Sequence, residues 1–283
     1  WMYGISGGLE CRIVMDKCQP LYSVLSIAGS DSSGGAGIQA DIKAISATGG
    51  YAASVITALT AQNTQGVQAI ESVSTVFVTQ QMDAVFTDLT IKAVKIGMLH
   101  SEAIIQAVRD AILKYKPPYV VLDPVKKKKN GSPLLADDLI DCLKTNLFSH
   151  VSLITPNLLE AEKITQQSIQ TKADMAATAE RMAQDYQTSV LIKGGHLTDA
   201  AMACDVLCVA GELTWFELPR IETKHTHGTG CTLSAAIASY LAQDQSLKEA
   251  VFNAKQYLFG AISSGSQYCI GQGAGPVHHF YTC

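Results

Sequence analysis

The segment Thr226–Ser234 has the residue types and spacing of an anion-binding site. Gly228 and Gly230 open a stretch of small residues with helical character, and consecutive backbone N–H groups at such a helix start can bind a phosphoryl group. Cys231 follows in the first helical turn, where the helix dipole lowers the pKa of a thiol. A buried structural cysteine explains Cys231 alone equally well, but the whole segment favours a reacting centre.

Charged and amide side chains follow three other apolar runs. Asp123 and Lys193 each come directly after a run that we predict to be a strand. Asn157 and Glu160 stand at a predicted helix start, where they are best explained in isolation as a capping box. Their functional interpretation is an oxygen shell for hydrated Mg²⁺. Lys193 could meet a phosphate there, although a lone lysine is usually a surface residue.

A second glycine-rich loop, Gly29–Gly37, joins a predicted strand to a predicted helix. Its glycines permit tight turns and a close approach of the backbone to a ligand. The loop matches neither the Walker A motif nor GxGxxG, so alone it is weak evidence for a phosphate site. In isolation, Asp31 and Asp41 are interpreted as helix-capping or solvent-facing residues.

Apolar runs and helical periods alternate along the chain, and they must position these loops. The predicted strands are 22–28, 54–59, 91–96, 119–122, 151–154 and 189–192, with an antiparallel pair at 203–209 and 213–218. The predicted helices are 36–48, 75–86, 101–115, 136–145, 174–186, 230–242 and 247–263. This order predicts an α/β fold with a mostly parallel sheet, helices on both faces and antiparallel edge strands. Ligands then bind beyond the carboxyl ends of the strands.

The composition excludes several classes of protein. The 283 residues are 47% hydrophobic, enough for a sizeable core, and a net charge of −4 argues against a nucleic-acid binder. We expect no membrane span and no signal peptide. The eight cysteines show no CxxC, so we expect free thiols in a reducing cytoplasm. One domain at 22–283 after an N-terminal extension at 1–21 is the simplest organisation.

Taken together, these segments resemble the ribokinase-like superfamily and, within it, the hydroxymethylpyrimidine/phosphomethylpyrimidine kinase family of thiamin biosynthesis. The shared motifs occur in order between about Tyr22 and Tyr281. They are Ala28–Asp41, Ile56–Thr64, Lys95–Leu99, Thr155–Asn157 with Glu160, Lys193–His196, Thr226–Ser234 and Gly275–Phe280. The resemblance implies a three-layer α/β/α fold.

The resemblance also implies a pocket for the pyrimidine. Gln62 would hydrogen-bond the aminopyrimidine ring, and the rest of the pocket would be formed by Gly29, Ala36, Asp41 and Met98.

For the nucleotide, the resemblance implies that Lys193 and Thr226 bind the phosphates. Asn157 and Glu160 would belong to an NxxE motif for Mg²⁺ and phosphate, with Asp123 beside them at the metal and the nucleotide.

The implied reaction uses ATP and Mg²⁺ to phosphorylate a hydroxymethylpyrimidine to its monophosphate and then to its diphosphate. The backbone amides of Gly228, Thr229, Gly230 and Cys231 would stabilise the transferring phosphoryl group. Cys231 stands where sugar kinases of the superfamily place a catalytic Asp, so it would serve as the base. The implied partners are small molecules and a second copy of the chain in a homodimer, with no nucleic acid and no membrane.

Lys126–Lys128 depart from the family pattern, which has hydrophobic and small residues at this point. The pattern returns at Gly131–Leu135. This departure leaves open a pyrimidine-binding module without catalysis. A pyridoxal/pyridoxine kinase is the nearest enzymatic alternative, although Gln62 and Met98 favour the pyrimidine. A Rossmann-type oxidoreductase is disfavoured because GxGxxG and a ribose-binding acid are both missing.

Overall fold

The apolar runs become the strands of one central sheet. The computed structural model describes residues 21–124, 128–129, 132–133, 137–195, 197 and 201–282, so nearly all of the predicted extension at 1–21 lies outside the described residues. The strands of the sheet are β1 (Ser23–Ala28), β2 (Tyr51–Ile56), β5 (Ile91–Ile96), β6 (Tyr119–Leu122), β9 (Leu153–Ile154), β10 (Ser189–Lys193), β11 (Met202–Val209) and β12 (Glu212–Pro219).

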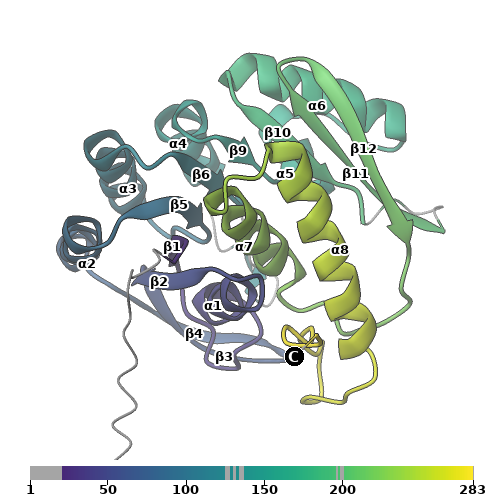
Figure 1. Ribbon diagram of the computed structural model, residues 1–283, viewed down its shortest axis with the longest axis horizontal. Helices are drawn as coiled ribbons and strands as arrows, with labels where there is room; N and C mark the ends of the chain where they lie inside the picture. The colour runs from purple at the N-terminus through teal and green to yellow at the C-terminus, as the bar shows by residue number, and fades with distance from the viewer. Residues whose placement is uncertain are drawn as a thin grey trace, which may run out of the picture.

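The sheet order is β12-β11-β10-β9-β6-β5-β1-β2 (Figure 1). The strands from β2 to β10 pair in parallel, whereas β11 and β12 are antiparallel. The predicted antiparallel strands therefore lie at one edge only. The carboxyl ends of the parallel strands share one side of the sheet, where the loops singled out above meet.

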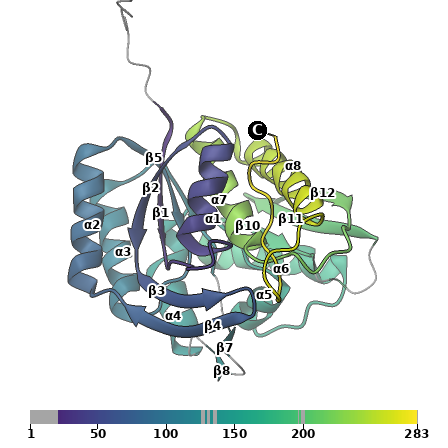
Figure 2. The same cartoon turned by 90° about the horizontal axis from the view of Figure 1, so that it is seen from below.

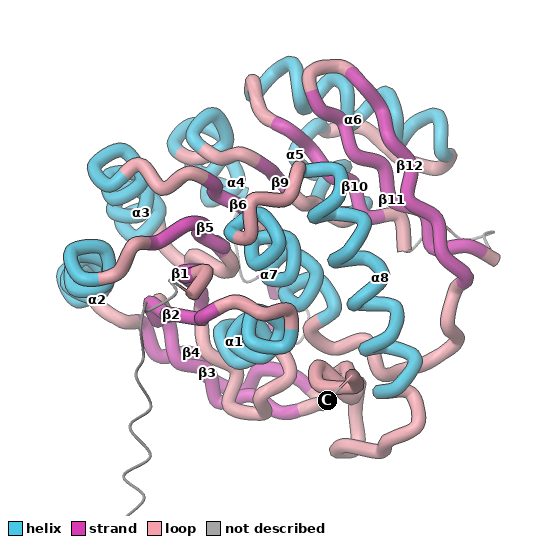
Figure 3. The backbone as a smooth tube through the Cα atoms, viewed as in Figure 1, coloured by secondary structure: helices cyan, strands magenta, loops and turns pink. Residues whose placement is uncertain are grey.

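Helices cover both faces of the sheet (Figures 1 and 3). One face carries α1 (Gly37–Ala47), α7 (Thr229–Ala242) and α8 (Leu247–Gly265). The other carries α2 (Thr75–Asp88), α3 (Glu102–Tyr115), α4 (Asp137–Asn146), α5 (Leu158–Thr165) and α6 (Lys172–Tyr186), with the 3₁₀ turn Phe148–His150 after α4. Each layer of helices has its own buried apolar cluster against the sheet. The predicted three-layer α/β/α fold is thereby confirmed.

Helix α7 occupies the centre of its layer because its side chains are small. Alanines recur along it, and it packs against α1, α8, β5 and β6. Small side chains let a helix approach its neighbours closely on every side. Its first turn is thus held rigidly at the carboxyl ends of the central strands.

The prediction of a single strand at 54–59 is wrong. The chain bends at Thr57, whose hydroxyl donates to Met98 O, and continues as β3 (Ala58–Asn63). β3 pairs with β4 (Gly66–Ser72) in a separate two-stranded sheet (Figure 2). β4 escaped prediction because its only long apolar residues are Val67 and Ile70.

A short hairpin of β7 (Lys128–Lys129) and β8 (Ser132–Pro133) lies beside β4. The departure from the family pattern rests on Lys126, Lys127 and Lys128. The first two lie outside the described residues, and Lys128 begins β7. Among the helices that the structure describes, none is both long enough and apolar enough to span a membrane.

Candidate active site

A pocket opens at the carboxyl ends of β1 and β5, against the start of α7. Three residues predicted from the sequence, Gly29, Met98 and Cys231, line it. Its full lining is Ala28, Gly29, Ser30, Gly37, Thr60, Lys95, Met98 and Cys231. Ala36, also predicted, is buried beside the pocket and packs with Cys231. Residues that are far apart in the sequence therefore form one small, mostly apolar cavity.

Cys231 is the residue that joins this pocket to the helix start. It is 8% exposed and lines the pocket together with Gly37 at the start of α1. Burial raises the pKa of the Cys231 thiol; Lys95 opposes this shift, while Asp41 and Asp123 add to it. The expected lowering of this pKa is therefore wrong, because loss of water outweighs the helix dipole and the nearby ammonium.

Gly228 is the N-cap of α7 and has a left-handed backbone with φ of 80°. It has no side chain to cap the helix, so no side-chain bond from the N-cap position satisfies the first N–H groups of α7. A Cβ at this position would collide with Gly35 O. The two glycine-rich loops therefore touch, and only glycine fits the contact.

Thr226 and Thr229 lie at the outer edge of this helix start. The Thr229 hydroxyl donates to Thr226 O at 3.1 Å. Thr226 is exposed and Thr229 half-buried, so a ligand at the N-terminal start of α7 can reach both.

Asp123 and Lys193 form an ion pair at the ends of β6 and β10. Lys193 Nζ is 2.7 Å from Asp123 Oδ1, which Thr155 also contacts at 3.2 Å. A Cβ on Gly230 would lie 3.3 Å from Lys193 Nζ and 3.4 Å from Asp123 Oδ2. The pair therefore faces the first turn of α7. Although burial works against its charge, Asp123 and then Glu160 raise the pKa of Lys193, so it stays a cation.

Asn157 and Glu160 form a capping box at the start of α5. The Asn157 side chain accepts from Glu160 N at 2.9 Å, and Glu160 Oε2 accepts from Asn157 N at 2.8 Å. A β-bridge joins Asn157 to Lys193, so the capping box lies beside the ion pair. The interpretation as a capping box is confirmed. The same box sets the Glu160 carboxylate near Lys193, so it is compatible with the interpretation as part of an oxygen shell for Mg²⁺, which stays a prediction.

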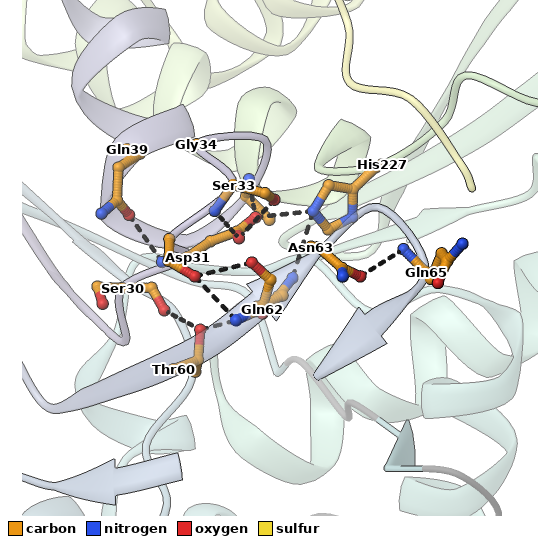
Figure 4. A network of polar contacts seen from close by, with 12 residues as sticks. Ser30, Asp31, Ser33, Gly34, Gln39, Thr60, Gln62, Asn63, Gln65 and His227 are labelled. Atoms are coloured by element: carbon orange, nitrogen blue, oxygen red, sulfur yellow. Dashed lines mark hydrogen bonds and ion pairs between the residues drawn. The ribbon is translucent and has the colours of Figure 1, made fainter. Parts of the chain in front are cut away.

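Asp31, His227 and Gln62 form a buried polar network across the two glycine-rich loops (Figure 4). Asp31 is 1% exposed, so interpreting it as a solvent-facing residue is wrong. Its Oδ2 lies 2.7 Å from His227 Nε2 and accepts from Ala36 N at 2.8 Å. Burial raises the pKa of Asp31, but the bonds from His227 and Ser33 outweigh that effect and lower it overall.

Gln62 lies beside His227, with its Nε2 atom 3.3 Å from His227 Nε2. The Thr60 hydroxyl, 3.2 Å from Gln62 Oε1, has one proton and gives it to Ser30 O at 2.7 Å. His227 Nε2 lies between Asp31 Oδ2 and the Gln62 amide. His227 thus contacts both Asp31 and Gln62, a link that sequence reasoning missed.

Asp41 does not line the pocket itself. It is fully buried and binds Lys95, which does line it. Sequence reasoning assigned no role to Lys95. The available signal was a lysine at an inward position of the otherwise mostly apolar strand β5.

The sheet, the pocket and the glycine-capped helix start beside it define a small-molecule kinase of the ribokinase-like fold. A family model described as phosphomethylpyrimidine kinase matches residues 31–278. The hydroxymethylpyrimidine/phosphomethylpyrimidine kinase of Rhizobium meliloti is 50% identical over 258 residues, which cover 91% of this chain and 96% of that relative. The enzyme of the same name from Escherichia coli is 44% identical over 266 residues, covering 92% and 97%. The chain therefore belongs to the phosphomethylpyrimidine kinase family.

Solved structures agree with this assignment. The chain matches the phosphomethylpyrimidine kinase of Clostridium difficile with a TM-score of 0.75 and 44% identity, covering 85% of this chain and 99% of that one. It also matches a pyridoxal kinase of Bacillus subtilis, solved as an ADP complex, with a TM-score of 0.86 and 32% identity, covering 93% and 98%. The same fold therefore serves kinases of two related ring substrates.

Proposed function

We propose that this enzyme transfers the γ-phosphoryl group of ATP first to the hydroxymethyl group of 4-amino-5-hydroxymethyl-2-methylpyrimidine and then to the resulting monophosphate. The observation that carries this proposal is the double position of Cys231, which lines the pocket and also lies in the first turn of α7. A hydroxyl bound in the pocket meets a phosphoryl group bound at that turn. The family relationship supports the choice of the aminopyrimidine.

The nucleotide would lie on the other side of Cys231, toward Lys193. The N–H groups of Gly230 and Cys231 would hold the oxygens of the transferring group, where fixed donors stabilise developing charge best. Lys193 would neutralise the phosphates beside Asp123. Positioning and charge neutralisation are most of what phosphoryl transfer requires.

Mg²⁺ fits this arrangement through few protein ligands. In the part of the chain that the structure describes, no group of three or more His, Cys, Asp or Glu side chains could hold a metal ion. Mg²⁺ commonly uses one or two carboxylates together with phosphates and water, and Asp123 Oδ2 faces Gly230. Asp123 and Glu160 would hold the ion, with the Glu160 carboxylate kept in place by the capping box. The ion would supply charge neutralisation between the phosphates.

The two acceptors place different demands on Cys231. In the first reaction, the hydroxyl oxygen bonds to the γ-phosphorus, ADP leaves with the bridging oxygen, and the hydroxyl proton passes to Cys231 in the minor fraction of molecules whose thiol is ionised, because burial raises the pKa of this thiol. A phosphate monoester is largely ionised at pH 7 and gives up no such proton. The thiol therefore serves the first reaction, whereas the N–H groups serve both.

A pyridoxal kinase is the second candidate, because the pyridoxal kinases of Bacillus subtilis and Staphylococcus aureus share this fold with TM-scores near 0.86. The polar network around Gln62 favours the aminopyrimidine, since an amide can both donate to and accept from the ring. The third candidate is a module that binds the pyrimidine without catalysing phosphoryl transfer.

Coupled ADP release with Mg-ATP and each acceptor separates these candidates. We expect turnover with the hydroxymethylpyrimidine and with its monophosphate, and much slower turnover with pyridoxal at equal concentration. Faster turnover with pyridoxal would overturn the proposed substrate. Binding of the pyrimidine by calorimetry without any ADP release would identify the silent module.

We further propose that each chain folds as one domain at 22–283 and that two chains form a cytoplasmic homodimer. The described cysteines Cys142, Cys204, Cys208, Cys231 and Cys269 are free thiols, in keeping with a reducing compartment. Light scattering on the purified chain tests the dimer.

A further inference from the structure

Lys95 is a charged residue inside the central sheet. It is the penultimate residue of β5, and its side chain is 0% exposed. Successive side chains of a strand point to opposite faces, so Lys95 shares the α1 and α7 face with Ala93, which packs in the cluster of that layer. Fully buried lysines are rare and always need a partner.

The partner of Lys95 is Asp41 on α1. Lys95 Nζ lies 2.8 Å from Asp41 Oδ2, and the Ser26 hydroxyl donates to the same oxygen at 2.6 Å. Burial raises the pKa of Asp41. Burial works against the ammonium too, yet Asp41, with Cys231 and Asp123 behind it, raises the pKa of Lys95. Lys95 is thus a permanent cation.

This ion pair is incomplete. An ammonium has three N–H groups, and among the described residues Asp41 is the one hydrogen-bond acceptor of Lys95. The second oxygen, Asp41 Oδ1, has no hydrogen-bond partner among them either. A buried polar group left without a partner costs about 1–3 kcal/mol, and apolar residues often replace such a pair without loss of stability. Stability therefore does not explain the pair.

The position of the ammonium does explain it. Lys95 lines the pocket together with Cys231 and Met98. A Cβ on Gly97 would lie 2.8 Å from Lys95 Nζ and 2.9 Å from the Ala28 Cβ atom, so the absence of a side chain at Gly97 leaves room for the ammonium. A fixed cation with unused donors therefore belongs to the wall of the space that the substrate would fill.

We propose that Lys95 is a further catalytic residue of this enzyme. Its ammonium donates a hydrogen bond to the hydroxymethyl oxygen and stabilises the negative charge that develops there as the proton leaves and the bond to phosphorus forms. Asp41 holds the ammonium in place before the substrate arrives. Such a preorganised donor in a pocket poor in water is worth far more than the same contact in solution.

This proposal rests on the proposed function, and it is tested by removing the charge while keeping the pair neutral. Lys95→Met alone would strand Asp41 as a buried carboxylate, so the main variant is Lys95→Met with Asp41→Asn. The matched control is Lys255→Met with Asp205→Asn, because Lys255 and Asp205 form another buried ion pair, between α8 and β11 and away from the pocket. The Asp205→Asn change keeps a side-chain oxygen that can accept from Gly194 N.

The readouts are kcat for the hydroxymethylpyrimidine, the Kd of this pyrimidine by calorimetry, and the circular dichroism of each variant. We expect kcat of the Lys95→Met/Asp41→Asn variant to fall about 100-fold or more, the usual loss for one transition-state donor, with Kd within about threefold of the wild type. The control should keep the wild-type kcat. A kcat within about threefold of wild type, or a weaker Kd that accounts for the whole loss, would overturn the proposal.

Failure of this proposal differs from failure of the proposed function. If the wild-type enzyme does not phosphorylate the pyrimidine, the proposed function itself is wrong. If the wild type is active and the Lys95→Met/Asp41→Asn variant is equally active, only the role of Lys95 is wrong. Lys95→Arg adds a further readout, because a retained cation should restore part of kcat if charge is what matters.

Discussion

At the scale of single residues, Cys231 and Gly228 have different roles at the start of α7. Cys231 carries a thiol whose pKa burial raises, so at neutral pH it is mainly protonated. Gly228 offers no chemistry but fixes the backbone that presents the N–H groups. The two residues can therefore be tested separately, one for proton transfer and the other for geometry.

Cys231→Ala should slow phosphorylation of the alcohol more than phosphorylation of the monophosphate. Loss of a general base typically costs about 100-fold or more in kcat, which we expect for the alcohol, and less than about 10-fold for the monophosphate. Initial rates at saturating ATP measure both. Equal losses on the two acceptors would show that the thiol does not act as a base.

Gly228→Ala should lose both stability and activity. An alanine there must adopt a left-handed φ and also meets Gly35 O, so we expect a loss of about 2–3 kcal/mol in the free energy of unfolding. Urea denaturation measures this loss, and the ADP-release assay measures the accompanying fall in kcat.

Gly211→Ala is the matched control. Gly211 has a similar φ of 83° in the β11–β12 turn, but a Cβ there meets nothing within 4 Å. It should cost only about 1 kcal/mol, for the backbone conformation, and leave kcat unchanged. Equal destabilisation by the two variants would mean that the contact with Gly35 is unimportant.

At the scale of elements, the tail at 266–282 holds together parts that are distant in sequence. Ala274 N donates to Thr64 O at the β3–β4 turn, and His227 N donates to Gly275 O. Farther along the tail, His279 is buried between α7 and α8: its Nε2 is 3.0 Å from the Thr232 hydroxyl, and its carbonyl accepts from the Tyr257 hydroxyl. The docking of the tail thus affects both loops of the site.

His279 should make stability depend on pH. Burial, assisted by Lys43 and His278, lowers the pKa of His279 from 6.5 to about 4, so the unfolded chain binds a proton that the folded chain does not between these values. Stability from this residue is intact above pH 6.5 and falls as the pH drops toward 4. From pH 7.5 to pH 5 the loss should be about 2 kcal/mol.

Urea denaturation of the wild type and of His279→Gln at several pH values measures this contribution. The other histidines are common to both proteins, so the difference between the two curves isolates His279. The difference in the free energy of unfolding between the wild type and His279→Gln should decrease by about 2 kcal/mol from pH 7.5 to pH 5. Parallel curves would contradict the assignment.

The sequence predicted elements well where they have clear ends. The strands Ile91–Ile96 and Tyr119–Leu122 have the predicted ends because polar, glycine or proline residues flank their mostly apolar runs. Lone polar residues were harder to interpret. The partner of Asp31, His227, is 196 positions away, and the burial of Lys95 follows from Asp41, which belongs to another element. No local pattern carries such pairings, so the motifs gave the loops of the site but not its internal contacts.

At the scale of the whole molecule, the sheet and both helical layers contribute to one site, so ligand binding should stabilise the entire fold. The pyrimidine at a hundredfold excess over its Kd adds about 2.7 kcal/mol to the free energy of unfolding. For a chain of this size we expect Tm to rise by about 5 °C. Differential scanning fluorimetry measures the rise, with pyridoxal as the comparison ligand. A larger rise in Tm with pyridoxal than with the pyrimidine would indicate that pyridoxal is the preferred substrate.

The pocket is lined by Ala28 and Gly29 near one end of the chain and by Cys231 near the other. A ribosome adds about 5–20 residues per second, so roughly 10–40 s separate the synthesis of these walls. During that interval the nascent chain has its glycine-rich loop and Lys95 but no helix α7 to cover them. Asp41 and Lys95 can pair early and keep each other's charge satisfied. Their ion pair can therefore form before α7 is synthesised, and α7 packs over it later.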